Sequence, residues 1–534
     1  MTLFTARLQG TQEEMGAQHG RLVADEARAL LAFYRTMPER ALAGGEGVLG
    51  KTVVRAAAAA LQARLARERP AELVARSRAF ARAAGLPEAA SLRTLATMDS
   101  LQNCVALVAK APLGPFAEGV ALRAAVPACS SVIAWGSVTA GGELLFARNF
   151  DFPGVGVWDA APAFVVCAET GGQRYGFFTT KGADTPVVTV VNEAGLVFAP
   201  HTRFHHDVTF GGAMIVDLVH DLARRAESIA DAIRIARERP ASSSWGIAVG
   251  SARERTGVVL ELAGPHVEVV RPSGDYLVCA NRYRTPALQE REIRRSQAWP
   301  LHSAHREARL RARIEGRTAP LTAEDLARFL GDREVAGARR HFGCVAQPTN
   351  VHAAVVAPAS CRALVGVDRA PTCEGRWADV RWAWDAPAAG WQLSLRDDVG
   401  APHSKAARHV HAAARAFEGA HDIAAARLEI DRAIEAAPAD PSLRLAATWL
   451  ALEDRADAPA VEHVRAGLEL EGDGYRRGQL LLWGARAARR VDPALAVRWR
   501  GELDALPGVE DLQAEARRPF RGRPRINLMM VDAY

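Results

Sequence analysis

The sequence predicts a layered α+β fold followed by a helical C-terminal domain. Three observations predict it: helical periodicity over residues 20–110, short β-branched and aromatic runs broken by glycine from residue 112 on, and helical periodicity again after residue 405. Strands grouped in blocks, with helices in blocks, indicate a layered sandwich and argue against an alternating parallel sheet. A chain of 534 residues also exceeds one hydrophobic core, so we expect more than one unit.

Residues 20–110 are expected to form helices. This part is rich in Ala, Arg and Leu, and Arg55–Arg64 and Ala71–Ala84 carry the apolar spacing of helices. Gly85 and Pro87 follow the second run and are typical of a helix end.

Short strands are expected after residue 112. The separators Ala140–Gly142, Thr170–Gly172 and Glu193–Gly195 are typical of hairpin turns, so most strands should pair antiparallel. The first expected strands are Ser131–Val138, Glu143–Asp151, Ala163–Glu169, Tyr175–Thr180, Val187–Val191 and Leu196–Pro200.

A second alternation of helices and strands follows. The spacing predicts a long helical stretch over Ala213–Glu238 and helices near 303–315 and 322–331. The further expected strands are Trp245–Gly250, Gly257–Leu262, Val267–Val270, Tyr276–Cys279, Val351–Val356 and Ala363–Val367.

Residues 396–404 are expected to be a linker, and residues 405–534 a helical tail. The break at Gly472–Gly474 comes 33 residues after Ala439, the period of tetratricopeptide-like helix–turn–helix units. A generic set of helical hairpins would show much of the same pattern.

Composition excludes several classes of protein. With 49% hydrophobic and 24% charged residues the chain is globular. Its net charge of +6 comes from 67 Lys and Arg against 61 Asp and Glu, spread over the whole length with no basic patch, so we expect no nucleic-acid partner. The first thirty residues lack the apolar run of a signal peptide, and no eighteen-residue apolar stretch occurs, so we expect a cytoplasmic protein without a membrane partner.

The seven cysteines are widely spaced and odd in number, which argues against a disulfide framework and leaves a reactive thiol open. Cys129 begins an expected strand, and Arg148 and Asp151 end the next one. A neighbouring cation lowers the pKa of a thiol from ~8.5 toward neutrality, and the thiolate is the nucleophile. The structural alternatives are a small buried hydrophobic residue for Cys129 and a surface ion pair for Arg148 and Asp151.

Four motifs carry a family resemblance. They are Leu8–Gly20, Cys129-Ser-Ser, Arg148-Asn-Phe-Asp151 and Asn192-Glu-Ala-Gly-Leu196. Together they resemble the isopenicillin-N acyltransferase family and its relatives the choloylglycine hydrolases, which are N-terminal nucleophile hydrolases. The resemblance covers residues 1–395 and implies a four-layer αββα fold, with a helical pro-segment at 1–128 and the catalytic core at 129–395.

The resemblance implies a precursor that cleaves itself between Ala128 and Cys129. The free α-amino group of Cys129, with a reference pKa of ~7.7–8.0, would then serve as general base. Arg148 would polarise the thiol and Asp151 would hold the new amino group. No cofactor is implied. Ala128 stands where the acyltransferase relatives commonly have glycine, and alanine is still small enough for the strained turn that self-cleavage needs.

Further site residues are also implied by the resemblance. Asn281, one of six asparagines, matches an oxyanion-binding asparagine, and its alternative is a turn residue closing a strand. Arg306 matches a second active-site arginine of the bile-salt hydrolases. Thr202, beside His201, stands where those relatives have another oxyanion asparagine.

Some residues near these motifs have competing interpretations. His201, His205, His206 and Asp207 could be metal ligands on a helix, but their strand and loop context makes a metal site the weaker interpretation, and we predict none. Lys181 is expected at a solvated hairpin tip, and the alternative is a position facing a pocket. The aromatic residues near the nucleophile are expected in the core or in an acyl-pocket wall; they are Trp135, Phe150, Phe152 and Trp158.

The predicted function is that of a cysteine amidase or acyltransferase acting on a small amide or thioester. Water or an amine would take the acyl group from Cys129, and the sequence does not decide between them. The alternative is a weakly catalytic or non-catalytic scaffold that binds a protein partner through the helical tail. A third possibility, catalysis without cleavage, would need His201 or Asp151 as the base.

Overall fold

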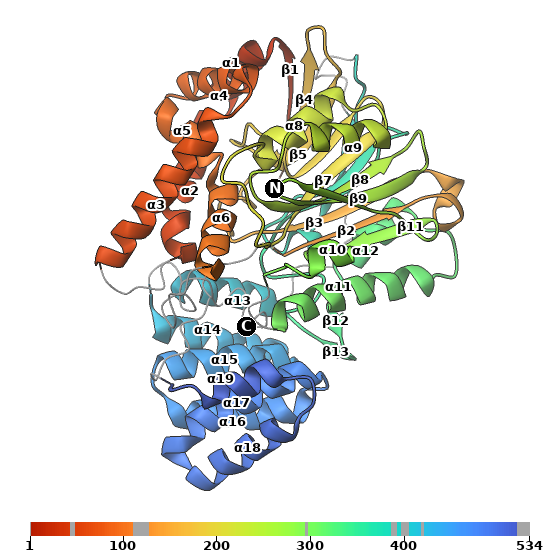
Figure 1. The fold of residues 1–534 in the computed structure, drawn as a ribbon. Coiled ribbons are helices and arrows are strands. Elements are labelled where there is room, and N and C mark those ends of the chain that lie inside the picture. The colour runs from red at the N-terminus through yellow and green to blue at the C-terminus, as the bar shows by residue number, and fades with distance from the viewer. Residues whose placement is uncertain are drawn as a thin grey trace. The chain divides into compact units, whose positions relative to one another are not determined.

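The computed structural model describes residues 2–42, 48–110, 128–293, 297–385, 392–396, 405–417 and 421–520 (Figure 1). The chain divides into two compact units. The first consists of residues 1–293, 310–331 and 349–401, and the second of residues 294–309, 332–348 and 402–534. All but one residue of the predicted linker at 396–404 lies outside the described residues.

The larger sheet of the first unit has eight strands in the order β1-β4-β5-β6-β7-β8-β9-β10. β1 pairs parallel to β4, and every other neighbouring pair is antiparallel, as the hairpin separators predict. The strands are β1 (Phe4–Gly10), β4 (Pro162–Glu169), β5 (Tyr175–Thr180), β6 (Thr189–Asn192), β7 (Leu196–Thr202), β8 (Ser244–Ser251), β9 (Thr256–Ala263) and β10 (His266–Val270).

The second sheet has seven antiparallel strands in the order β11-β2-β3-β14-β15-β16-β17. Its register places Cys129 opposite Phe150 and Ser131 opposite Arg148. The strands are β11 (Tyr276–Cys279), β2 (Cys129–Ala134), β3 (Leu145–Asp151), β14 (Asn350–Ala357), β15 (Arg362–Gly366), β16 (Trp377–Arg381) and β17 (Gln392–Arg396).

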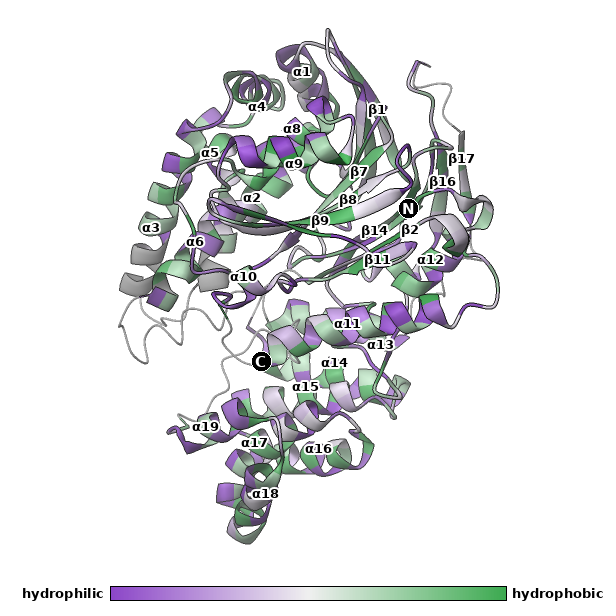
Figure 2. Ribbon diagram, turned by 45° about the vertical axis from the view of Figure 1, so that its right-hand side comes forward, coloured by the Kyte–Doolittle hydropathy of each residue, from purple (hydrophilic) through white to green (hydrophobic). Residues whose placement is uncertain are grey.

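The two sheets pack face to face with helices on both outer sides. Ile133 and Phe146 of one sheet lie in the same buried core as Phe164 and Phe178 of the other. On the outer face of the eight-stranded sheet lie α8 (Ile215–Arg225) and α9 (Ile229–Glu238), and α12 (Ala323–Leu330) packs on β3, β14 and β15. Figure 2 shows hydrophobic and hydrophilic residues on α8 and α9, as expected for helices with one buried face. The predicted αββα arrangement is confirmed.

The structure differs from the sequence expectations at three kinds of place. The predicted helical stretch 213–238 is two helices, because Ser228 caps α9 by accepting a hydrogen bond from the backbone N–H of Asp231. The strand expected over Ser131–Val138 begins at Cys129 and ends at Ala134, and Gly136 follows with a φ of 58°. The sequence prediction does not include three strands that the structure has, namely β1, β16 and β17.

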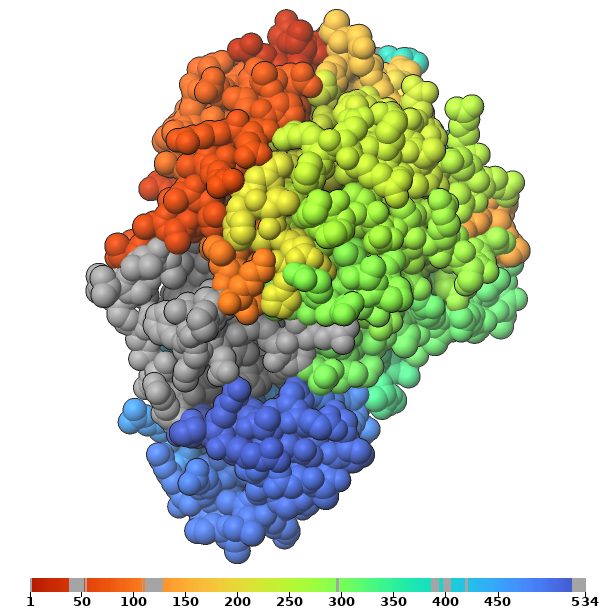
Figure 3. All heavy atoms as spheres, in the orientation of Figure 1, coloured from red at the N-terminus to blue at the C-terminus, as the bar shows by residue number. Residues whose placement is uncertain are grey.

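Helices formed by the N-terminal residues lie beside the sandwich in the first unit (Figure 1), and in Figure 3 their red and orange atoms border the yellow and green atoms of later residues. A capping box between Thr11 and Glu14 starts α1. A Cβ at Gly16 or Gly20 would come within 2.4 Å of a carbonyl oxygen of α4, so these glycines allow α1 and α4 to pack closely. The helices are α1 (Gln12–Leu22), α2 (Ala24–Leu42), α3 (Val48–Arg67), α4 (Ala71–Ala83), α5 (Glu88–Thr94) and α6 (Thr97–Lys110).

The second unit contains the helical tail. Aspartate side chains cap α14, α15, α17 and α18 by accepting hydrogen bonds from backbone N–H groups of the first turn. The tail is helical as predicted, and its tetratricopeptide-like character stays a prediction. Its helices are α13 (Lys405–Arg415), α14 (Ile423–Ala436), α15 (Pro441–Glu453), α16 (Asp457–Leu470), α17 (Gly474–Val491), α18 (Pro493–Ala505) and α19 (Glu510–Arg517).

Two segments from the middle of the chain belong to this second unit. One is residues 294–309, which include the first part of α11 (Ala298–Glu315), and the other is residues 332–348. Arg340 forms a buried ion pair with Glu471, and Nδ1 of His341 lies 2.6 Å from a carboxylate oxygen of Asp440. Nε2 of His411 lies 2.6 Å from the carbonyl oxygen of Pro348. The tail helices therefore bind segments of their own chain.

Candidate active site

The thiol of Cys129 lies at the first residue of β2, facing the other sheet. Cys129 is 1% exposed, and its thiol forms no disulfide with any cysteine of the described residues. Nη2 of Arg148, on the neighbouring strand β3, donates a hydrogen bond to Sγ of Cys129 at 3.2 Å. A guanidinium at this distance stabilises the thiolate form of a cysteine. The structure thus brings the predicted nucleophile and the predicted cation together.

Arg148 is held by β7 of the opposite sheet. Its Nη1 donates to Nε2 of His201 at 2.8 Å, and its Nη2 also donates to the carbonyl oxygen of Pro200. A guanidinium can only donate, so Nε2 of His201 is the acceptor and the neutral ring carries its proton on Nδ1. The hydroxyl of Ser131 lies 3.0 Å from the same Nε2. These contacts fix the guanidinium beside the thiol.

Asn281 binds the backbone nitrogen of the nucleophile. It follows β11, which pairs with β2 so that Cys279 lies opposite Ser131. The backbone N–H of Cys129 donates to Oδ1 of Asn281 at 2.7 Å, and Nδ2 of Asn281 donates to the carbonyl oxygen of Thr202 at 3.0 Å. The side-chain amide of Asn281 therefore connects β2 with the end of β7.

A buried ion pair supports the loop that carries Asn281. The guanidinium of Arg203 donates to the carboxylate of Glu261 and lies over the ring of Tyr283, 4.9 Å from its centre. Glu261 also accepts hydrogen bonds from the hydroxyl and backbone N–H of Thr285, at 2.7 and 3.0 Å. Burial alone would raise the pKa of Glu261, but the charge and hydrogen bonds of Arg203 outweigh it and lower that pKa. Glu261 is therefore an ionised anchor for this loop.

Asp151 ends β3 and is fully buried. Because side chains alternate along a strand, Asp151 projects from the sheet face opposite to that of Arg148. Its Oδ1 accepts a hydrogen bond from Nδ2 of Asn350 at 2.9 Å, across the pairing of β14 with β3. Oδ1 of Asn350 in turn accepts from the hydroxyl of Thr372 and the backbone N–H of Cys373, each at 2.9 Å. Asn350 thus orients the carboxylate at the end of β3, the strand that also carries Arg148.

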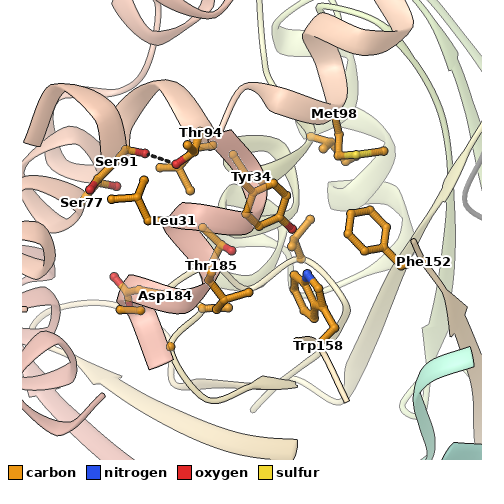
Figure 4. Close-up of a pocket in the computed structure, with 18 of the residues that line it drawn as sticks. Leu31, Tyr34, Ser77, Ser91, Thr94, Met98, Phe152, Trp158, Asp184 and Thr185 are labelled. Carbon is orange, nitrogen blue, oxygen red and sulfur yellow. Dashed lines mark hydrogen bonds between the residues drawn. The ribbon is translucent and has the colours of Figure 1, made fainter. Parts of the chain in front are cut away.

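A cavity of about 140 Å³ opens against Cys129. Phe150, Phe152, Pro200 and Thr202 contribute to its wall near the nucleophile, and Phe150 stacks on Phe152 with ring centres 5.1 Å apart. The N-terminal helices supply much of the remaining wall, with Leu30, Leu31 and Tyr34 from α2 and Met98 from α6. Figure 4 shows Tyr34, Trp158 and Phe152 around this space. The lining is mainly apolar.

The other residues named from the sequence have different surroundings. Arg306 is buried in the second unit, where its Nη2 lies 3.5 Å from the hydroxyl of Ser303, so its active-site role stays a prediction.

Trp135 lies in the core between the sheets. Lys181 lies in the turn that follows β5, where its side chain is 25% exposed and its Nζ pairs with Glu26 at 2.6 Å. His201 and His205 lie on a strand and in a loop, and the described residues contain no group of three or more His, Cys, Asp or Glu placed to hold a metal ion.

Several contributors to the site are missing from the sequence prediction. Ser131 and Asn350 contact His201 and Asp151, and the wall residues of α2 and α6 lie far before the nucleophile in the chain. The scarcity of asparagine is a signal that could have selected Asn350, because it is one of only six asparagines in the sequence. The helix residues carry no local signal, since their spacing is that of any amphipathic helix.

Comparison with protein families gives one match. Residues 138–364 match the family model of the acyl-coenzyme A:6-aminopenicillanic acid acyl-transferase. This region is similar to that family. The predicted resemblance is therefore confirmed for these residues, which include Arg148, Asp151 and Asn281 and begin after Cys129.

Among solved structures, the Caenorhabditis elegans N-acylethanolamine-hydrolyzing acid amidase ortholog is similar, with 14% sequence identity and a TM-score of 0.32. The similarity covers 43% of this chain and 93% of that chain. A comparison with curated proteins found no match. None of the helices within the described residues is long and apolar enough to cross a membrane.

Proposed function

We propose that the protein is a cysteine amidohydrolase or acyltransferase that forms an acyl-enzyme at Cys129. The observation that carries this proposal is the thiol of Cys129 at the wall of an apolar cavity, with Nη2 of Arg148 at 3.2 Å. The substrate is an amide or thioester whose acyl group is mainly apolar, because the lining offers few hydrogen-bonding groups near the nucleophile.

Activation begins with cleavage of the Ala128–Cys129 bond. Sγ of Cys129 attacks the carbonyl carbon of Ala128, the acyl group moves from nitrogen to sulfur, and water hydrolyses the resulting thioester. The products are a carboxylate on Ala128 and a free α-amino group on Cys129. The contact of this nitrogen with Oδ1 of Asn281 supports the next step, since the released amine already has an acceptor that orients it.

In turnover the free amine takes the thiol proton while Sγ attacks the substrate carbonyl. The tetrahedral intermediate collapses when the ammonium group returns this proton to the leaving amine or thiol, which departs and leaves a thioester on Cys129. Water or a second amine then attacks the thioester and restores the thiol. Nδ2 of Asn281 is the proposed donor to the oxyanion of each tetrahedral intermediate.

His201 is an unsuitable base for this thiol. Its Nε2 accepts a hydrogen bond from Arg148, so that nitrogen cannot also take the thiol proton while the contact holds. We propose that His201 positions Arg148. We propose that Asp151, whose carboxylate accepts a hydrogen bond from Asn350, stabilises the charge of the amine at the start of β2. The carbonyl of Thr202 fixes the amide of Asn281.

A role for the tail as a docking surface has less support. The helices that would present such a surface contact the chain's own residues 340–348 through Asp440, Glu471 and His411. A partner for this face would have to displace a buried ion pair.

Intact-mass analysis and N-terminal sequencing of the purified protein test the proposal. We expect two fragments, the second beginning at Cys129, and a single acyl adduct on that fragment after incubation with a slowly hydrolysed thioester substrate. Cys129→Ala should give one uncut chain and no adduct. An adduct on another residue, or an equally active Cys129→Ala variant, would place the nucleophile elsewhere.

A further inference from the structure

The cavity at Cys129 has a polar end as well as an aromatic one. In Figure 4, Phe152 and Trp158 lie on one side, and Ser77, Ser91 and Asp184 lie on the other. The aromatic side is the one next to the nucleophile, because Phe152 stacks on Phe150, which pairs with Cys129. The polar end is therefore the distal end of the cavity, where the far part of an acyl group would lie.

Asp184 gives this end a hydrogen-bond acceptor. Its Oδ1 accepts from Nδ1 of His19 at 2.8 Å and from Nη2 of Arg76 at 2.6 Å, whereas its Oδ2 accepts from Nε of Arg76 at 2.9 Å. Burial raises the pKa of Asp184, but the charge of Arg76 and the hydrogen bond of His19 lower it overall, so the group is ionised. A carboxylate has about four lone-pair sites, and one on Oδ2 is left for a further donor.

Ser77 gives the same end a donor. It is only 9% exposed, and its Oγ accepts a hydrogen bond from Nη1 of Arg69 at 3.1 Å. A hydroxyl that accepts still has its own proton to donate. Among the described residues no acceptor receives that proton, although the residue lines the cavity.

The charges at this end balance in pairs. Asp184 is paired with Arg76, and Arg69 is paired with Asp217 at 2.8 Å. A charged ligand group would therefore lose its hydration without gaining a net counter-charge. A neutral hydroxyl fits better, since its oxygen can accept from Ser77 while its proton goes to Asp184.

We propose that the acyl group bound by this cavity carries a neutral hydroxyl at its distal end, recognised by Ser77 and Asp184. The inference deepens the proposed function and rests on it for the orientation of the ligand. It adds the prediction that Ser77 determines specificity without taking part in the chemistry.

Binding to the Cys129→Ala variant tests the inference without any turnover. The probes are straight-chain fatty amides of one length series, each with a terminal methyl, hydroxyl, carboxylate or ammonium group, measured by calorimetry. We expect the best-fitting hydroxyl probe to bind about tenfold less tightly once Ser77→Ala is added to this variant, in line with the loss of one buried hydrogen bond. Ser77→Ala should leave the affinity of methyl probes unchanged.

Ser91→Ala is the matched control. Ser91 also lines the cavity, but its hydroxyl already donates to the carbonyl oxygen of Pro87 at 3.1 Å. This variant should keep the preference for the hydroxyl probe. Asp184→Asn should also lower the preference for the hydroxyl probe. Because this substitution alters the contacts of Arg76, the melting temperature of the Asp184→Asn variant is measured as well, to detect a loss of stability.

Each other outcome has a distinct meaning. One outcome is that the affinity of the hydroxyl probes is no higher than the cost of dehydrating their end group allows, and that Ser77→Ala leaves this affinity unchanged. That outcome would overturn the inference and indicate that water fills this end. Tighter binding of the carboxylate or ammonium probe would overturn it as well. Ser77-dependent binding in a protein that forms no acyl adduct would retain the subsite and refute the proposed function instead.

Discussion

The backbone N–H of Cys129 donates to Oδ1 of Asn281 at 2.7 Å. The nitrogen that becomes the general base in the proposed mechanism thus already has a fixed acceptor. The same side chain spans to Thr202 through its Nδ2, so one amide connects the base to the strand that holds Arg148. The acceptor role of Oδ1 and the donor role of Nδ2 can be tested separately by mutation.

Asn281→Asp should retain an acceptor for the nitrogen of Cys129 but lose the amide donor. We expect kcat to fall by about 10²- to 10³-fold, the usual effect of removing one oxyanion donor. Asn281→Leu should lose both contacts and also impair cleavage before Cys129, which mass analysis reports. A fully active Asn281→Asp variant would refute the donor role.

Arg148→Lys tests the stabilisation of the thiolate. The shorter ammonium group cannot keep the contacts to Cys129, His201 and Pro200 together, so the thiolate should be less favoured. We expect the pH profile of alkylation by iodoacetamide to move to higher pH. The rate at neutral pH should fall about tenfold if the pKa of the thiol rises by about one pH unit. Arg225→Lys, in an exposed pair with Glu238, should leave the profile unchanged.

Val187 lines the cavity and is only partly buried, so a larger side chain can be accommodated at that position. Val187→Phe should lower kcat/KM for long acyl groups more than for short ones. The expected loss is about fourfold for each methylene group excluded, since burial of one CH₂ contributes ~0.8 kcal/mol. Val497→Phe, at a position 75% exposed on α18, is the control, and an equal loss for all chain lengths would contradict the prediction.

His352 makes stability depend on pH. It is buried on β14, and neither ring nitrogen has a hydrogen-bond partner among the described residues. Burial and then the charge of Arg148 lower its pKa from 6.5 to about 3. The folded state therefore binds fewer protons than the unfolded state between these values, and stability falls as the pH drops below 6.5.

His352→Leu should remove this dependence. One such group changes the free energy of unfolding by up to about 1.4 kcal/mol per pH unit, and urea titrations between about pH 4 and 7 measure the slope. His266→Leu, at an exposed position, should leave the slope as in the wild type. An unchanged slope for His352→Leu would assign the acid sensitivity to other groups.

Glu471→Ala should destabilise the second unit. It leaves the buried guanidinium of Arg340 without its carboxylate, a change that costs about 3–5 kcal/mol. The double variant Arg340→Met with Glu471→Leu should recover most of this loss. Glu502→Ala, which breaks an exposed pair with Arg498, should change the free energy of unfolding by no more than about 0.5 kcal/mol.

Much of the architecture is predictable because it depends on local patterns. The hairpin separators predict antiparallel strands, and the boundaries of β5 and β11 agree with the sequence prediction. The break between α8 and α9 escapes prediction because Ser228 lies inside an otherwise continuous apolar spacing. β1 escapes it because the N-terminal strand owes its conformation to pairing with β4, which is distant in the sequence.

The site is predictable only where the motif residues are close in sequence. Cys129 and Arg148 come together because two adjacent strands form a hairpin. Asn281 is a site candidate from the sequence, but its contact with the backbone nitrogen of Cys129 depends on the pairing of β11 with β2, which spacing alone does not reveal. Asn350 and the cavity wall depend on still longer connections.

Residues 294–309 and 332–348 belong to the same compact unit as the tail helices, and this affects how the chain folds during synthesis. Both segments are synthesised before the tail helices that they pack against. Arg340 and His341 therefore lack their partners Glu471 and Asp440 until translation is nearly complete. Until then Phe342 and Val345, which are buried in the complete fold, stay exposed, and partly made chains with exposed apolar surface tend to bind chaperones or aggregate. Shortening the gene after residue 404 would make that waiting state permanent.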